Sequence, residues 1–143
     1  KIILLIVVVI VAAVAWYFWK DYQRPNADLK KATPDVTITA TKLIAAFEKD
    51  TASANKQYVD KIIEVTGNVK SIDAEENPVV IALGDGGQMS SVQCSMDSTY
   101  AALYKNVKEG DQLTLKGLCT GGKTEELFGT DVILNRCVLV IKK

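Results

Sequence analysis

Three cysteines and one short acidic loop are the residue groups in this sequence whose types could do chemistry. Cys94, Cys119 and Cys137 form no Cys-x-x-Cys pair, so the spacing used by zinc sites and thioredoxin-type motifs is absent. The segment Asp73-Ala74-Glu75-Glu76 has the oxygen donors that calcium prefers, but its spacing matches no EF-hand loop, and a solvated acidic turn explains it better. We therefore expect neither a metal nor a cofactor.

Cys119 and Cys137 lie in two segments that are typical of neighbouring strands. If these strands pair as an antiparallel hairpin, the two residues could form a disulfide, which requires Cα atoms within about 7 Å. Two buried free thiols are the equally supported alternative. A bridge would indicate an oxidising, extracytoplasmic location, whereas Cys94 falls on an apolar strand face and is expected to pack as a small hydrophobic residue.

The composition lacks the histidine that many enzymes use and the excess of basic residues that nucleic-acid binders use. The chain has no histidine, which removes the commonest general base and every Ser-His or Cys-His nucleophile arrangement. Its 17 basic and 17 acidic residues give a net charge of zero, a poor basis for neutralising many phosphates. The composition predicts a protein that is not an enzyme and for which nucleic acid is a disfavoured partner.

An apolar run opens the chain and predicts a helix over residues 1–20. From residue 2 to residue 19 it has no charged or strongly polar side chain, and as a helix it would span about 27 Å, close to the thickness of a bilayer core. Four aromatic residues followed by Lys20 resemble an interfacial belt. The residues expected to face lipid or sister helices include Ile2, Leu5, Val9, Ala12, Trp16 and Trp19.

Two uses of this helix stay open, a membrane anchor and self-association in a pilin-like filament core. Leu5 stands where type IV pilins usually carry Glu, which departs from the pilin pattern, and Ala13-Val14-Ala15 has the small-residue form of a signal-peptide cleavage site. The lysines and arginine after the run would place the globular part in the cytoplasm if the positive-inside rule were applied literally, but basic residues ahead of Lys1 would change that balance, so the rule does not decide the orientation. We expect a membrane-associated or cell-surface protein with an extracytoplasmic globular part.

The remainder of the chain predicts a polar linker over residues 21–36 and one domain over residues 37–143. Leu43, Ile44 and Phe47 follow helical spacing, so a helix should begin near residue 39 or 41, and a second helical turn should cover residues 52–58. Phe47 and Tyr58 are expected to cover one opening of a barrel rather than to line a partner groove.

Five strands with a helix between the third and the fourth are predicted next. The strands should lie at residues 62–73, 78–84, 90–96, 112–120 and 132–141, and the helix at residues 98–106. This is the element order of an OB-fold, a five-stranded Greek-key barrel. Gly67, in the middle of the first strand, suggests a bulge or a sharp coil.

The ordered segments KLIAAFEKDTASANKQYVDKIIEVTGNVKSID, VQCSM, KEGDQLTLKGLCTG and DVILNRCVLV resemble the tRNA_anti-like OB-fold family of bacterial proteins. The resemblance covers roughly Thr37 to Val140 and leaves the apolar run outside it. It implies the OB-fold and a distant similarity to anticodon-binding domains, and many members carry an N-terminal apolar segment. It implies no catalytic residues, because fold does not imply function.

The predicted ligand face of the barrel lacks the groups that grip single-stranded nucleic acid, namely aromatic platforms and a basic groove. The second and third strands, PVVIALG and SSVQCSM, have no aromatic residue, the loop at residues 73–77 is acidic, and the loop at residues 121–130 mixes Lys123 with Glu125 and Glu126. The sequence therefore favours a structural or interaction protein with protein partners. The alternative is a tethered barrel that binds nucleic acid, oligosaccharide or peptide.

Overall fold

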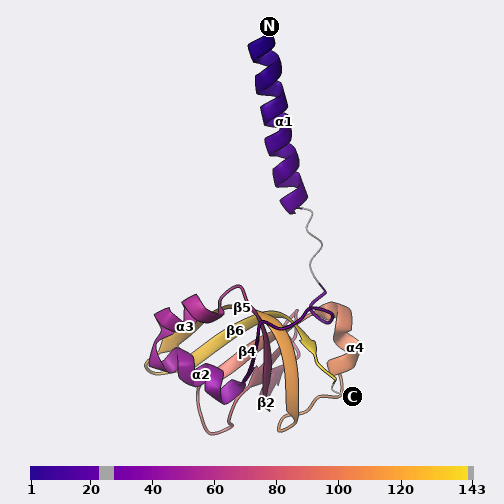
Figure 1. The fold of residues 1–143 in the computed structure, drawn as a ribbon. Helices are drawn as coiled ribbons and strands as arrows, with labels where there is room; N and C mark the ends of the chain where they lie inside the picture. Colours follow the sequence, from indigo (N-terminus) through magenta and orange to yellow (C-terminus); the bar gives the residue numbers. More distant parts are fainter. Residues whose placement is uncertain (23–27, 142–143) are drawn as a thin grey trace.

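A long N-terminal helix, α1 (Ile2–Tyr22), precedes a β-barrel in the computed structural model of the chain (Figure 1). The structure describes residues 1–22 and 28–141, without the side chains of residues 3–5 and 20–22. Within these residues, no helix combines the length and the apolar character that a membrane crossing requires. Five of the apolar positions singled out in the sequence are exposed, namely Ile2, Val9, Ala12, Trp16 and Trp19, and the side chain of Leu5 lies outside the described residues.

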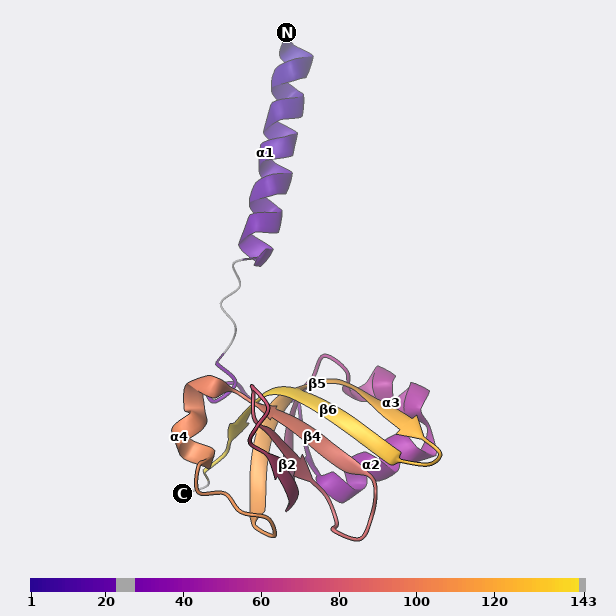
Figure 2. The ribbon, with the colours of Figure 1, turned by 180° about the vertical axis from the view of Figure 1, so that it is seen from behind.

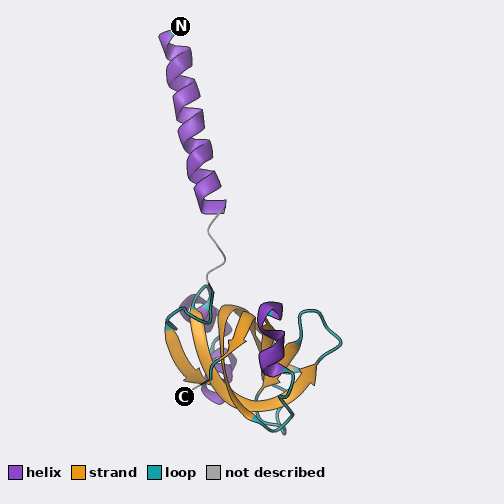
Figure 3. Cartoon of the chain, turned by 90° about the vertical axis from the view of Figure 1, so that its right-hand side faces the viewer, coloured by secondary structure: helices purple, strands orange, loops and turns teal. Residues whose placement is uncertain are grey.

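Six strands form one sheet that closes on itself (Figure 3). They are β1 (Val36–Thr39), β2 (Ile62–Asp73), β3 (Val80–Leu83), β4 (Ser91–Met96), β5 (Gln112–Glu125) and β6 (Gly129–Leu139). Their order is β1-β2-β3-β4-β6-β5, and β2 also pairs with β5, which closes the barrel over β2 to β6. Strands β4 and β6 run parallel, and the other four barrel pairings are antiparallel. This mainly-β closed barrel confirms the predicted OB-fold.

Strand β2 serves both halves of the barrel, as the glycine in its middle suggested. Residues 62–68 pair with β5, residues 69–73 pair with β3, and the register shifts between Val69 and Ser71. Gly67 itself has a different function: a Cβ there would stand 2.7 Å from the Cβ of Ala40, on the helix at Ala40–Lys49 that precedes this strand. The missing side chain at Gly67 therefore lets that helix approach the sheet.

Two helices cover one end of the barrel, and a short helical segment covers the other (Figures 1 and 2). Helix α2 (Ala40–Lys49) is capped by Thr39, and helix α3 (Thr51–Tyr58) by Asp50. Phe47 and Tyr58 are buried and stack with ring centroids 6.0 Å apart, which confirms that they cover the barrel opening. At the opposite end lie the 3₁₀ segment η1 (Ser98–Tyr100) and helix α4 (Ala101–Tyr104).

Two features of the sheet differ from the sequence prediction. Strand β1, which pairs parallel with β2, precedes α2 within residues where only a connector and a helix start were expected. Strand β5 continues to Glu125, so most of the expected glycine-rich loop is strand and only residues 126–128 turn into β6. Cross-strand pairing over residues 121–125 outweighs the low strand propensity of the two glycines there.

Candidate functional site

The three cysteines are buried free thiols. Cys119 lies opposite Leu134, and register irregularities in the β5–β6 pair bring the Cys137 sulfur against Gly117 instead of Cys119. Of the two predicted alternatives, the structure therefore has the free thiols and not a Cys119–Cys137 bridge. The Cys137 thiol contacts that of Cys94 on β4 instead. Burial raises the pKa of Cys119, and burial together with Cys94 raises that of Cys137. Protonated, inaccessible thiols are poor nucleophiles.

The acidic loop after β2 does not assemble a cation site. Its residues from Asp73 to Asn77 are exposed, and the Asp73 carboxylate accepts a hydrogen bond from the backbone N–H of Glu75. Over the described parts of the chain, no three His, Cys, Asp or Glu side chains are grouped as metal ligands would be. One member of the loop, Glu76, instead lines a hollow on the barrel surface.

That hollow is part of a groove over the outer face of the barrel, which we call the β4–β6 groove. Two cavities, of about 900 and about 390 Å³, share Ser95 as a lining residue and therefore lie side by side on this face. The floor comes from alternate residues of two parallel strands, Gln93 and Ser95 of β4 with Ile133 and Asn135 of β6. The residues that alternate with them, Val92 and Cys94 of β4 and Val132 and Leu134 of β6, are buried in the core, as the two-residue period of a strand requires.

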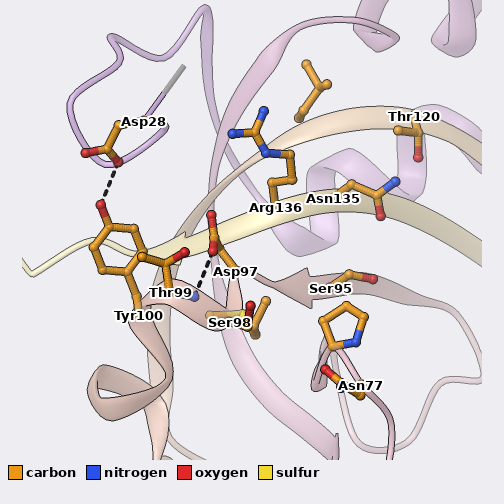
Figure 4. Close-up of a pocket in the computed structure, with 13 residues that line it drawn as sticks. Asp28, Asn77, Ser95, Asp97, Ser98, Thr99, Tyr100, Thr120, Asn135 and Arg136 are labelled. Carbon is orange, nitrogen blue, oxygen red and sulfur yellow. Dashed lines mark hydrogen bonds between the residues drawn. The ribbon is translucent and has the colours of Figure 1, made fainter. Parts of the chain in front are cut away.

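Loops and a helical segment form the ends and walls of the groove (Figure 4). Glu76, Asn77 and Pro78, before β3, supply one wall. Phe128, from the β5–β6 hairpin, stands at one end with 67% of its surface exposed. Asp97–Tyr100, between β4 and α4, close the other end.

A bulge in β6 adds a side chain that a regular strand would turn away. Arg136 has a positive φ of 56°, a left-handed conformation that residues with a Cβ seldom adopt, and the pairings of β6 with β4 and β5 both shift register around it. Asn135 and Arg136 consequently both line the larger cavity, although consecutive strand residues normally point to opposite faces.

The chain that follows α1 forms part of the same wall. We call residues 28–32 the strap, because Leu29 is buried and the buried Lys116 ammonium donates to the carbonyls of Lys30 (3.1 Å) and Ala32 (2.6 Å). The Tyr100 hydroxyl donates to the Asp28 carboxylate at 2.8 Å (Figure 4). This bond lowers the pKa of Asp28 and raises that of Tyr100.

The groove is acidic. Among its described lining residues, five carboxylates face two cations: Asp28, Glu76, Asp97, Glu125 and Asp131 against Lys123 and Arg136. Lys123 forms an ion pair with Glu125, which raises the lysine pKa. The carboxylate of Asp131 accepts from the Ser91 hydroxyl at 2.7 Å, and that of Asp97 from the Thr99 N–H at 2.9 Å.

The sequence predicted part of this site and missed the rest. Glu76 of the acidic loop, Lys123 and Glu125 were singled out in advance and do line the groove. Residues 97–100 and the Asn135–Arg136 pair were not, because the first set lies outside the strands and a bulge leaves no signal in an alternating pattern. The apolar positions of α1 are not among the residues that line it.

Comparison with solved structures supports the fold alone. A Klebsiella pneumoniae lipoprotein thought to bind nucleic acid has a TM-score of 0.56 at 14% identity, over 73% of this chain and 91% of that one. The OBody AM3L09, bound to hen egg-white lysozyme, has a TM-score of 0.45 at 13% identity, over 65% of this chain and 93% of that one. No curated protein sequence matches this chain. The membrane crossing, the filament role and self-association stay predictions.

The family comparison extends further along the chain than the resemblance seen in the sequence. The model of the tRNA_anti-like family matches residues 1–138, so the match includes α1 as well as the barrel, and the expectation that the apolar run lies outside it was wrong. The chain belongs to the tRNA_anti-like family.

Proposed function

We propose that this chain is a non-enzymatic interaction protein, attached through α1, that presents its OB barrel at a membrane or cell surface. The observation that carries the proposal is the exposure of α1: its side chains from Ile6 to Trp19 are all exposed, although none of them is charged. Covering one Val, Leu or Ile side chain is worth about 1.5–3 kcal/mol. A helix with so many of them is therefore stable in lipid or against other apolar helices.

Lipid and sister helices are the two environments that suit α1. Its 21 residues are about 31 Å long, and the sequence is apolar over residues 2–19, including residues 3–5, whose side chains the structure does not describe; this suits lipid and equally suits a helical bundle. The absence of histidine from the whole sequence supports a role without catalysis.

Flotation with neutral phosphatidylcholine vesicles tests the attachment. We expect the full chain to float and a Val9→Lys, Ala12→Lys variant to stay in the dense fractions, because two charges in mid-helix oppose burial in lipid. A Thr37→Lys, Ser71→Lys variant, with the same added charge on exposed barrel positions, should float like the unaltered chain. A chain that stays monomeric and does not float contradicts the proposal. Filaments in electron micrographs, or a discrete oligomer in detergent, would identify sister helices as the environment.

A second function, capture of a polymeric ligand by the barrel, is favoured by the β4–β6 groove. Its two adjoining cavities follow the strands across the barrel from the Phe128 hairpin to Tyr100. An open trough of this kind suits an extended chain better than a small molecule, which is usually enclosed. Its test is saturable binding of a labelled polymer, and the groove's chemistry decides which polymer.

A further inference from the structure

The size of the β4–β6 groove sets the length of its ligand. Strand β6 crosses the groove from Gly129 to Arg136, which is about 23 Å at a rise of 3.3 Å per residue. An extended peptide of about seven residues covers that distance. The floor is two strands wide and belongs to the closed part of the barrel, so a ligand there contacts side chains rather than adding a strand to a sheet edge.

The charge of the groove selects against polyanions. Five carboxylates and two cations line it, and one of the cations, Lys123, is already paired with Glu125. Asp97 lies at one end, Glu76 on a wall and Asp131 toward the other end, so negative charge follows the length of the groove. Such a surface repels phosphates and attracts Lys and Arg side chains.

The floor lacks the platform that bases and sugars stack on. Gln93, Ser95, Ile133 and Asn135 form it, and among the described lining residues the aromatic rings, Tyr100 and Phe128, are confined to the two ends. The Lys30 ammonium already lies 5.0 Å from the Tyr100 ring centroid. Amide side chains both donate and accept hydrogen bonds, which matches the alternating N–H and C=O groups of a peptide backbone.

The end of the groove at the hairpin has an exposed apolar pair beside its charged residues. Phe128 is 67% exposed and Ile133 is 40% exposed, and both line the smaller cavity with Gly129. An exposed aromatic ring beside an exposed Ile is a surface that an apolar side chain covers favourably. The opposite end has no such patch, because the strap and the hydroxyls of Ser98, Thr99 and Tyr100 surround it.

We propose that the β4–β6 groove binds an extended peptide of about seven residues that carries two or more Lys or Arg side chains and an apolar side chain at the Phe128 end. This inference rests on the proposed role of the groove as the binding face of the barrel. The ligand belongs to a basic protein partner, and the acidic side chains of the groove give the complex its rate of association and its choice of partner.

Fluorescence anisotropy on the full chain in a detergent with a neutral headgroup tests the ligand class. The probe is a labelled peptide, Leu-Gly-Lys-Ser-Lys-Gly-Lys, and its matched control has Glu in place of each Lys. We expect saturable binding of the basic peptide, weakened at least tenfold between about 50 and about 500 mM salt, and no binding of the acidic one. A labelled thymidine oligonucleotide and a labelled neutral hexasaccharide serve as probes for the other ligand classes.

Variants locate the binding on the barrel. Asp131→Asn with Glu76→Gln should weaken the basic peptide about five- to tenfold, since two charges facing the ligand are removed. Asp85→Asn with Glu109→Gln removes the same charge at exposed positions outside the groove and should leave the affinity unchanged. Phe128→Ala should remove the preference for a peptide with Leu over one with Gly at that end, and unchanged melting temperatures show that the variants are folded.

Two results overturn the inference in different ways. If the oligonucleotide or the hexasaccharide binds and the groove variants weaken it, the groove is the binding face but the ligand class is wrong. If no probe binds, or if both charge-neutralised variants behave alike, the groove has no binding role. Neither result affects vesicle flotation, which tests attachment through α1 separately.

Discussion

Replacing Gly122 by alanine should destabilise the barrel, because Gly122 is the place where strand β5 meets the ring of Phe47. An added Cβ would stand 2.6 Å from Cε1 of that ring and closer still to Cδ1. The ring has no room to withdraw, since Phe47 is fully buried and stacks on Tyr58. The backbone at Gly122 has no positive φ, so the cost measures the packing of α2 against β5 alone.

The expected loss follows from the energetics of overpacked cores. Forcing one extra methyl group into a filled core costs about 1–3 kcal/mol. For a domain of this size each kcal/mol lowers the melting temperature by about 4–8 °C, so thermal unfolding should shift down by about 4–24 °C. Gly86→Ala is the matched control, because a Cβ there meets nothing within 4 Å, and it should change stability by less than about 1 kcal/mol.

Circular dichroism melts of both variants, with Phe47→Leu alone and combined with Gly122→Ala, make the test decisive. If the clash is real, the smaller Leu side chain accommodates the new methyl group, and the double variant is more stable than the sum of the two single losses predicts. A Gly122→Ala variant that melts with the unaltered chain, or two losses that simply add, would refute this packing of α2 on the barrel.

Four further predictions concern the strap, the helix cap and the thiols. Lys116→Met keeps the buried stem but removes the ammonium that two strap carbonyls share, so we expect a loss of about 1–3 kcal/mol and faster proteolysis within the strap. The Asp28–Tyr100 hydrogen bond lowers the pKa of the Asp28 carboxyl from 3.8 and raises the pKa of the Tyr100 phenol from 10.0. Its contribution to stability should be complete between these two values. That contribution should be lost as pH falls through the lowered pKa of Asp28 or rises through the raised pKa of Tyr100. In Asp28→Asn, tyrosinate absorbance should show Tyr100 titrating closer to its ordinary range. Asp50→Ala removes the α3 cap and should lower stability at neutral pH, with less difference in acid, because the Ser53 hydroxyl holds the Asp50 pKa low and the native advantage is lost as pH falls through it. All three thiols should react with an aromatic disulfide reagent in denaturant and none in the native state, whereas a Cys119–Cys137 bridge would leave one thiol to react.

The alternating pattern of the strands was sufficient to predict the barrel, because the inward residues of an OB-fold recur every second position. Strand β2 begins and ends where that pattern predicted, and Phe47 and Tyr58 cover the barrel opening as expected. The groove could not be predicted from this alternating pattern. The Arg136 bulge depends on how β6 pairs with two partners at once, and the strap depends on contacts between Lys116 and residues more than eighty positions earlier.

The strap links attachment through α1 to ligand binding in the β4–β6 groove. Asp28 lines the groove and lies six residues after Tyr22, the last residue of α1, so the chain between them reaches at most about 22 Å. Whatever surrounds α1 therefore holds the groove within that distance of its own surface. A ligand reaches the groove only when it comes close to that surface. If the ligand is attached to the same surface, the shared attachment raises its effective concentration at the groove, as in linked binding modules. A modest affinity for basic peptides is sufficient under these conditions, and a groove whose recognition is mainly electrostatic, with fast association and fast release, is suited to that arrangement.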